Sequence, residues 1–280
     1  LYGLLFKAVS ETLMELAANP KHMGAMIGSI SILHTWGQNI MHHPHIHNIV
    51  PGGGLSRDGR KWKSCKKDFF VHVKVMSKLF RGKFLAYLKK LRAEKKLIYP
   101  GAVSHLASPG AFNALISDLH KKKWIVYCKP PFKETKDVLE YLGRYTHRIA
   151  ISNHRLVKLE NDEVSFRWRD YADNNKKKIM TLDADEFIRR FLLHVLPDRF
   201  VKIRHYGILG NRCRRKKLER ARELLACVDR NKAEQKTETW QEVLFRIAGI
   251  DVAKCPACGE RRMRTVEIMQ PARCKGPPRK

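Results

Sequence analysis

The sequence predicts an α+β fold, in which amphipathic helices accompany short antiparallel strands. Apolar residues recur at helical spacing from Leu1 to about Ala18 and again from Phe69 to Glu94. Residues 26–36 and 46–50 are instead rich in Ile and flank a short polar break, and a Pro-Gly-Gly-Gly turn follows at residue 51. This pattern is typical of two adjacent strands that run in opposite directions.

The rest of the chain shows both kinds of pattern. Helical spacing predicts helices over residues 112–120, 134–145, 185–195, 212–222 and 240–248. Short apolar runs bounded by turn residues predict strands over residues 124–128, 148–152, 156–159, 164–168 and 178–182. Helices and short strands in one chain indicate the α+β class.

A change in composition near residue 210 predicts two regions. Residues 1–210 contain the candidate catalytic groups described below, whereas residues 211–280 are strongly basic and end in a polar tail without apolar periodicity. The chain starts at Leu1, inside the first predicted helix. We therefore expect that a piece of the natural protein precedes it.

The charge balance predicts an anionic partner. The chain has 56 Lys and Arg against 27 Asp and Glu, a net charge of +29, and the basic residues are spread along its whole length. Such a distribution favours nucleic acid, with a basic but otherwise ordinary enzyme as the alternative. Neither a membrane-spanning apolar run nor an export signal is visible in the sequence, so we expect a soluble protein that works in the cytoplasm without a membrane partner.

Two histidines form a candidate metal site. On a strand, alternation places His45 and His47 on one face and leaves Ile46 to the core. Two imidazoles aimed at one point are preset ligands for a divalent metal, Mg or Mn in this hypothesis. The alternative is that these histidines form the polar end of an ordinary strand.

The third ligand of this site is predicted to be Gln38. It lies seven residues before His45, and its side chain can reach the same face if residues 32–38 pair antiparallel with the histidine strand. Three nearby histidines compete for this role, namely His34, His42 and His43.

Two tyrosines are candidate nucleophiles. Tyr141 and Tyr145 are four residues apart, so a helix presents them on one face. A tyrosine that attacks a phosphodiester keeps the bond energy in a phosphotyrosine, which makes the cut reversible. Arg144, His147 and Arg148 can bind the phosphates on either side of the cut. A tyrosine pair at this spacing also occurs in ordinary helix packing, which is the alternative.

A cysteine pair near the end of the chain is a candidate zinc site. Seven cysteines at irregular spacings do not form a disulfide framework, whereas Cys255 and Cys258 have the Cys-x-x-Cys spacing of zinc ligands. A tetrahedral site needs two further ligands, and Cys274 is the nearest downstream cysteine. A reduced turn without metal is the alternative.

Together these motifs resemble the two-tyrosine HUH rolling-circle transposases of bacterial insertion sequences, the IS-ninety-one type. The segments that carry the resemblance are HTWGQNIMHHPHIHNIVPGGGLS (residues 34–56), YLGRYTHRIAISNHRL (residues 141–156) and the later CPACG. The resemblance implies an HUH nuclease-like antiparallel sheet flanked by helices, with His45 and His47 as ligands and Tyr141 and Tyr145 as nucleophiles.

The resemblance also implies a function. Such an enzyme cleaves and rejoins single-stranded DNA, at transposon ends and target, through a 5′-phosphotyrosine intermediate, and it acts at the bacterial nucleoid. A replication initiator nuclease of the rolling-circle type and a DNA-binding remnant without catalysis are the alternatives. The chain departs from the family pattern at its front, where an upstream cysteine-rich module and a first strand are missing, so we expect a gap or an exposed edge in the sheet.

Overall fold

The structure, a computed structural model, consists of two compact units, Leu1–Cys227 and Val228–Lys280, which are described separately. It describes residues 1–66, 70–132, 134–146, 150–226, 239–249, 251–255, 257–260 and 263.

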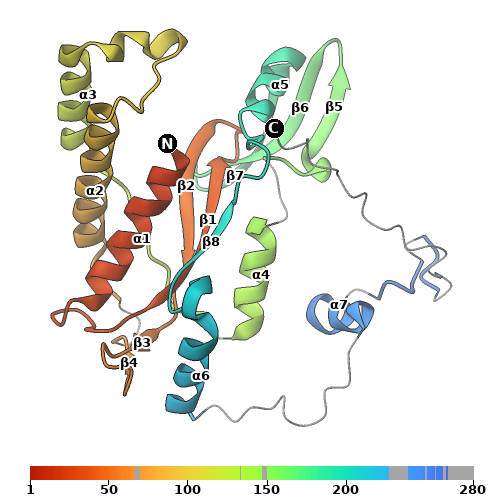
Figure 1. The fold of residues 1–280 in the computed structure, drawn as a ribbon. Coiled ribbons are helices and arrows are strands. Elements are labelled where there is room, and N and C mark those ends of the chain that lie inside the picture. Colours follow the sequence, from red (N-terminus) through yellow and green to blue (C-terminus); the bar gives the residue numbers. More distant parts are fainter. Residues whose placement is uncertain are drawn as a thin grey trace, which may run out of the picture. The chain divides into compact units, whose positions relative to one another are not determined.

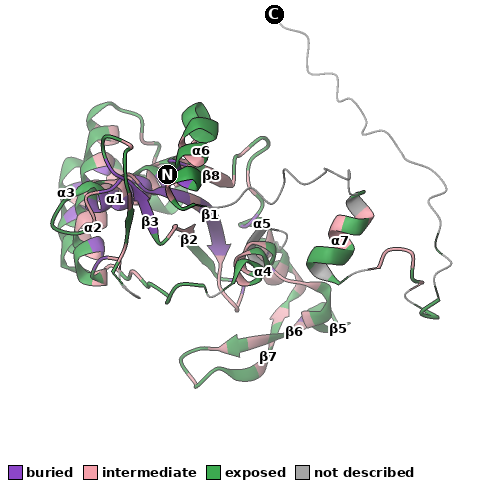
Figure 2. Ribbon diagram, turned by 90° about the horizontal axis from the view of Figure 1, so that it is seen from below, coloured by how far each residue is buried: buried purple, intermediate pink, exposed green. Residues whose placement is uncertain are grey.

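A three-stranded antiparallel sheet forms the centre of the first unit (Figure 1). Its middle strand, β1 (Gly28–Trp36), pairs with β2 (His42–Ile49) on one side and with β8 (Ile203–Gly207) on the other. Seven of the nine residues of β1 are buried, as the purple colour of that strand in Figure 2 illustrates. Because β1 has a partner on both edges, it is the strand whose position fixes the others.

Helices cover one face of this sheet. The buried side of α1 (Tyr2–Ala18) packs against Ile27, next to β1, and against Met76 of α2 (Val73–Ala93). A 3₁₀ helix, η1 (Gly101–Ala107), leads into α3 (Pro109–Lys121). The apolar side of α3 packs on α2 through the four buried residues Leu85, Leu88, Phe112 and Ile116.

The other β elements are a hairpin and a meander. The hairpin pairs β3 (Gly53–Leu55) with β4 (Trp62–Ser64). The meander is an antiparallel sheet of β5 (Leu156–Glu160), β6 (Glu163–Asp170) and β7 (Lys176–Asp183), and α5 (Ala184–Leu192) follows it. Its central side chain, Phe166, is fully buried against Ile40 and Ala150.

The first unit extends beyond the boundary that the sequence predicts near residue 210. After η3 (Asn211–Cys213), helix α6 (Arg214–Leu224) packs through Ala221 and Leu224 on Leu55 and Ile208. The basic side chains of α6 obscure this narrow apolar side in the sequence. In the second unit, α7 (Trp240–Ala248) starts with a capping box formed by Thr239 and Glu242.

The α+β class, with antiparallel sheets flanked by helices, is confirmed. The strand predicted over residues 124–128 is wrong: the segment is irregular, and its apolar alternation reflects packing of one side on helices. Of the predicted strand 148–152, residues 150–152 are not a strand and residues 148–149 lie outside the described residues. Within the described part of the chain, no helix is long and apolar enough to span a bilayer.

Gly207 provides a test of this packing. It has φ +62°, and a Cβ there would lie 1.9 Å from the carbonyl oxygen of Ile27. We expect Gly207→Ala to lower the free energy of unfolding by at least about 2 kcal/mol, because it combines left-handed backbone strain with a clash against backbone. Urea unfolding of the full chain measures this loss.

The matched control is Gly82→Ala on α2, where nothing lies within 4 Å of the new Cβ. This change should raise stability by about 0.5–1 kcal/mol, since alanine is the better helix former. Equal effects of the two substitutions would contradict the close approach at Gly207.

Candidate metal centre and tyrosine site

The register between β1 and β2 brings three histidines together. His34 lies opposite His45, and Ile32 lies opposite His47. Cross-strand neighbours point to the same side of a sheet, so the three imidazoles share one face. Their ligand atoms all lie within 4.8 Å of one another.

The geometry of this histidine cluster fits a metal ion. The Nε2 atoms of His45 and His47 are 3.0 Å apart, and the ring of His34 lies 4.5 Å from that of His47. Two nitrogens that bind one metal at about 2.0–2.1 Å and at right angles to each other are separated by about 3 Å. The donor set is therefore compatible with an HUH metal site.

Hydrogen bonds and burial prepare these rings for binding. The His43 carbonyl accepts a hydrogen bond from Nδ1 of His45 at 2.7 Å, which leaves the lone pair of Nε2 directed at His47. Burial lowers the pKa of His45. Burial, together with the charges of His34, His45 and Lys129, lowers the pKa of His47 to about 3. Both imidazoles are thus neutral near pH 7, as metal ligation requires.

Helix α4 (Thr135–Thr146) places one candidate nucleophile beside this cluster. The hydroxyl of Tyr141 lies 2.8 Å from Nδ1 of His47, and the Tyr141 ring packs edge-on against Phe132 at 5.4 Å. Arg144 and Tyr145 also lie on α4, but their side chains are outside the described part of the structure, as are the whole of His147 and Arg148.

The four candidates for a third ligand lie in different surroundings. Gln38 follows β1 in the turn, and its amide nitrogen donates to the Tyr171 hydroxyl at 3.1 Å. His42 contacts the Tyr2 hydroxyl at 2.9 Å, and the carbonyl of His43 binds His45. His34 is the candidate whose ring packs against both predicted ligands.

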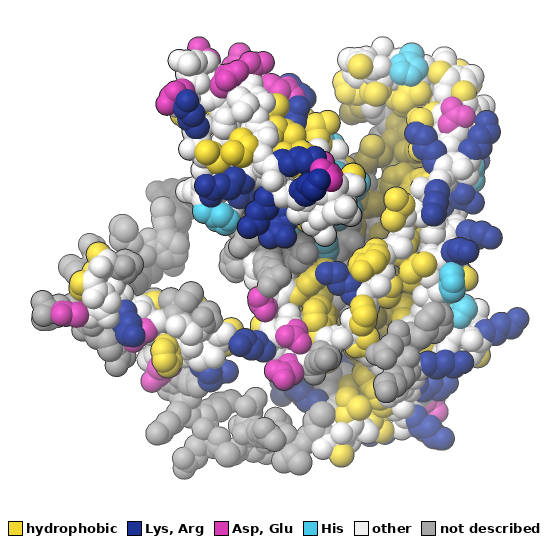
Figure 3. Space-filling model, turned by 180° about the vertical axis from the view of Figure 1, so that it is seen from behind, with side chains coloured by type: hydrophobic (Ala, Val, Ile, Leu, Met, Phe, Trp, Pro, Cys, Tyr) yellow, Lys and Arg dark blue, Asp and Glu magenta, His cyan; other side chains and the backbone are white. Residues whose placement is uncertain are grey.

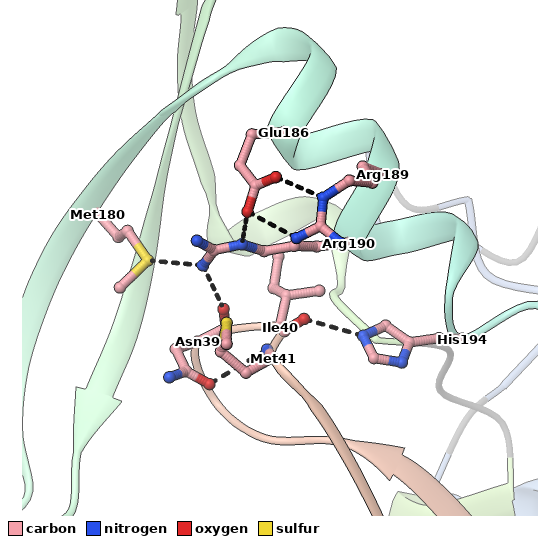
Figure 4. Close-up of polar contacts among 8 residues, drawn as sticks. All are labelled: Asn39, Ile40, Met41, Met180, Glu186, Arg189, Arg190 and His194. Carbon is pink, nitrogen blue, oxygen red and sulfur yellow. Dashed lines mark hydrogen bonds and ion pairs between the residues drawn. The ribbon is translucent and has the colours of Figure 1, made fainter. Parts of the chain in front are cut away.

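Side chains from the segments that flank the meander hold the turn between β1 and β2, a contact that the sequence does not reveal. In Figure 4, Arg190 donates to the carbonyl of Asn39 at 3.4 Å, and Nε2 of His194 donates to that of Ile40 at 3.0 Å. Arg155 donates to the preceding carbonyl, that of Gln38. Three successive carbonyl groups are therefore held by side chains from η2 (Asn153–Arg155), from α5 and from the turn after α5, and these three side chains form a clamp.

Other contacts orient the clamp. Glu186 binds Nε of Arg190 at 2.7 Å and Arg189 at 2.6 Å, and these two guanidinium groups lower the pKa of Glu186 to about 2. His194 is buried, and burial lowers its pKa, so the ring is neutral. Since its Nε2 proton goes to Ile40, Nδ1 accepts the hydroxyl proton of Thr35 at 3.1 Å.

The cysteine pair lacks comparable support. Among the described residues, the group of three side chains that could hold a metal is the histidine cluster, and Cys274 lies outside those residues. The thiol of Cys255 has a pKa below its usual value because backbone groups of Cys258 and Ala257 and the Cys258 side chain bind it. Zinc at Cys255 and Cys258 remains a prediction from the motif.

The clamp predicts a loss of stability in His194→Ala. That variant leaves the Thr35 hydroxyl and the Ile40 carbonyl without this partner, which should cost about 1–3 kcal/mol in urea unfolding. Replacement of the exposed His154 by Ala is the matched control and should cost less than about 0.5 kcal/mol. If both variants unfold alike, His194 does not hold the turn.

Comparisons with known proteins agree with this arrangement. The family model Y2_Tnp, described as "Putative transposase", matches residues 28–217. The chain is 48% identical, over 99% of its length and 70% of the relative's, to "Putative transposase y4qJ" of Sinorhizobium fredii. It is 25% identical to "Transposase for insertion sequence element IS801" of Pseudomonas savastanoi pv. phaseolicola, covering 96% of this chain and 63% of that protein. No solved structure matches. The chain belongs to the Y2 transposase family.

Proposed function

We propose that this chain cleaves and rejoins single-stranded DNA through a 5′-phosphotyrosine intermediate in rolling-circle transposition. The observation that carries the proposal is the 2.8 Å contact between the Tyr141 hydroxyl and Nδ1 of His47, a member of the histidine cluster. It puts a nucleophilic oxygen beside the candidate metal ligands. The names of the relatives favour transposition over replication initiation, which would use the same chemistry.

In this reaction the phenol oxygen of Tyr141 forms a bond to phosphorus, and the bond from phosphorus to the 3′ oxygen breaks. The phenol loses its proton and the departing 3′ oxygen gains one, so charge and protons balance. The 5′ end remains attached to the enzyme. A 3′ hydroxyl of another strand can then attack the phosphotyrosine and reverse the bond changes, which joins the strands without an external energy source.

His47 can act on the tyrosine through its second nitrogen. Its Nε2 faces His45, whereas its Nδ1 faces Tyr141. With Nε2 serving as a ligand atom, Nδ1 carries the ring proton and donates it in a hydrogen bond to the phenol oxygen. This bond engages one lone pair of the phenol oxygen and stabilises the negative charge that develops when the phenol proton leaves.

His34, His45 and His47 would hold the metal ion in this proposal. A bound divalent ion supplies Lewis-acid polarisation and orientation of the scissile phosphate. Three imidazoles favour an ion that accepts nitrogen ligands, Mn over Mg, because Mg prefers oxygen. Arg144, His147 and Arg148, on and after α4, are proposed to contact the phosphates around the cut.

The surface charge supports DNA as substrate. Figure 3 shows Lys and Arg side chains along the edge formed by α2 and α3 and over the lower part of the meander. A net charge of +29 spread in this way binds phosphate backbones through many weak contacts. Binding should therefore survive changes in the histidine cluster that abolish cutting.

Replacement of the tyrosines tests the proposal. Tyr141→Phe should lose most of the covalent adduct formed with single-stranded oligonucleotides and Mn, since it removes the oxygen beside His47 and keeps the ring. Tyr145→Phe should lose strand transfer but retain cleavage, and the double variant should form no adduct. Denaturing gels measure the adduct yield, and mass spectrometry locates the linkage.

The control is Tyr99→Phe. It removes a hydroxyl that is bound by Arg92 and is distant in sequence from the candidate site, so the adduct yield should not change. Cutting by the double variant at the wild-type position and rate would assign the nucleophile to water or another group. A wild-type chain that binds DNA but never forms an adduct would instead be a binding protein without catalysis.

The third ligand can be assigned by two single substitutions. We expect His34→Ala to weaken Mn binding at least about tenfold, and Gln38→Ala to have a smaller effect, because the Gln38 amide binds Tyr171. Calorimetric titration with Mn measures both affinities, and circular dichroism checks that each variant is folded. A larger loss for Gln38→Ala would return the third-ligand role to Gln38.

A further inference from the structure

The segment that connects α3 to α4, residues 122–132, has one side attached to the helices. The Trp124 ring packs against Phe80 at 5.2 Å and Phe84 at 5.3 Å, and its Nε1 donates to the Leu119 carbonyl at 2.9 Å. Val126 packs on the cluster between α1 and α2. These inward contacts determine which residues of the α3–α4 segment face outwards.

The outward side alternates with the inward side. Lys123, Ile125, Tyr127 and Lys129 are all exposed, Ile125 to 85% and Tyr127 to 79%. Because Trp124 and Val126, which lie between them, pack inwards on the helices, these exposed side chains form an outward side with an aromatic and an apolar residue between two cations. Lys121 and Lys122, which directly precede Lys123, are exposed as well.

The far end of the α3–α4 segment reaches the candidate active site. Phe132 contacts the ring of Tyr141, whose hydroxyl binds His47. A strand of DNA whose phosphate lies at Tyr141 would therefore have its neighbouring nucleotides beside this segment.

We propose that the α3–α4 segment binds the single-stranded DNA that leads to the cleavage site, with Tyr127 stacking on a base and Lys123 and Lys129 contacting phosphates. The proposal rests on the proposed function and extends it to a binding surface.

The chemistry favours a single strand over other occupants. Aromatic rings set between cations bind unpaired bases, because every base offers a face for stacking and every nucleotide brings a phosphate. Duplex DNA keeps its bases stacked and leaves nothing for Tyr127 to cover. A protein partner could pack against Ile125 and Tyr127, but it would also have to supply carboxylates to pair with Lys123 and Lys129.

Binding without metal tests the segment separately from cleavage. In EDTA, with fluorescein-labelled oligodeoxythymidylate as the probe, Tyr127→Ala should weaken binding by at least about fivefold, and Tyr127→Phe should bind like wild type because the ring remains. Duplex DNA of the same length should bind Tyr127→Ala and wild type equally. Fluorescence anisotropy measures the three affinities for the single strand and the two for the duplex.

The salt dependence of binding tests the lysines. Lys129→Ala should lower the slope of log affinity against log salt by about 0.7, the loss of one phosphate contact on a single strand. Lys21→Ala removes the same charge from the exposed turn after α1, outside the α2 and α3 edge and the meander, and should leave the slope unchanged. Photocrosslinking of 5-iodouracil oligonucleotides, followed by mass spectrometry, should locate a base at Tyr127.

Wild-type affinity in Tyr127→Ala, equal losses in the Ala and Phe variants, equal loss on duplex DNA, or crosslinks elsewhere would each overturn the inference. These readouts are independent of cutting. If wild type forms no adduct with Mn but the EDTA measurements behave as expected, the proposed catalysis fails and the binding segment stands. If adducts form but Tyr127→Ala binds normally, the proposed catalysis stands and the binding segment fails.

Discussion

The pairing of β1 with β2 determines everything else in the candidate site. His34 lies opposite His45, and the diagonal neighbour His47 completes the cluster. Because side chains alternate along a strand, a slip of one residue would carry His45 and His47 to the face covered by α1. The register is reinforced on that opposite face, where the Ser31 hydroxyl donates to the Asn48 side chain at 2.6 Å.

The turn that joins the two strands is costly to form. Ile40 has φ 58°, a left-handed conformation that disfavours a β-branched side chain by about 1–2 kcal/mol. Its side chain is fully buried against Phe166, and its carbonyl binds His194. The part of the chain between α4 and β8 is therefore structurally important, because Phe166 of the meander and His194 after α5 compensate the strain of a turn more than a hundred residues earlier in the chain. In this way it holds the strand register.

Periodicity predicts local features of this protein well. The alternation that places His45 and His47 together, and the helix that carries Tyr141, both follow from spacing within a few residues. The third histidine is harder, because the ladder is irregular between His34 and Trp36, and a shift of this kind cannot be seen in one sequence. Likewise β8 and the clamp depend on long-range contacts, because their partners lie on β1 and on the turn after it. Their own segments are short and polar, so they carry no clear periodicity.

The two halves of the site differ in how firmly they are held. In the sheet half, β1 has a neighbouring strand on both edges. Seven residues of α1, which covers one face of the sheet, are buried. In α4, by contrast, none of the described side chains from Thr135 to Gly143 is buried. The two proposed nucleophiles are four residues apart, which is about 6 Å along a helix, so each can reach one phosphate only if the helix or the DNA shifts by a similar distance. In the proposed mechanism, a rigid set of candidate ligands on β1 and β2 and a lightly packed helix with the tyrosines would satisfy these opposite requirements.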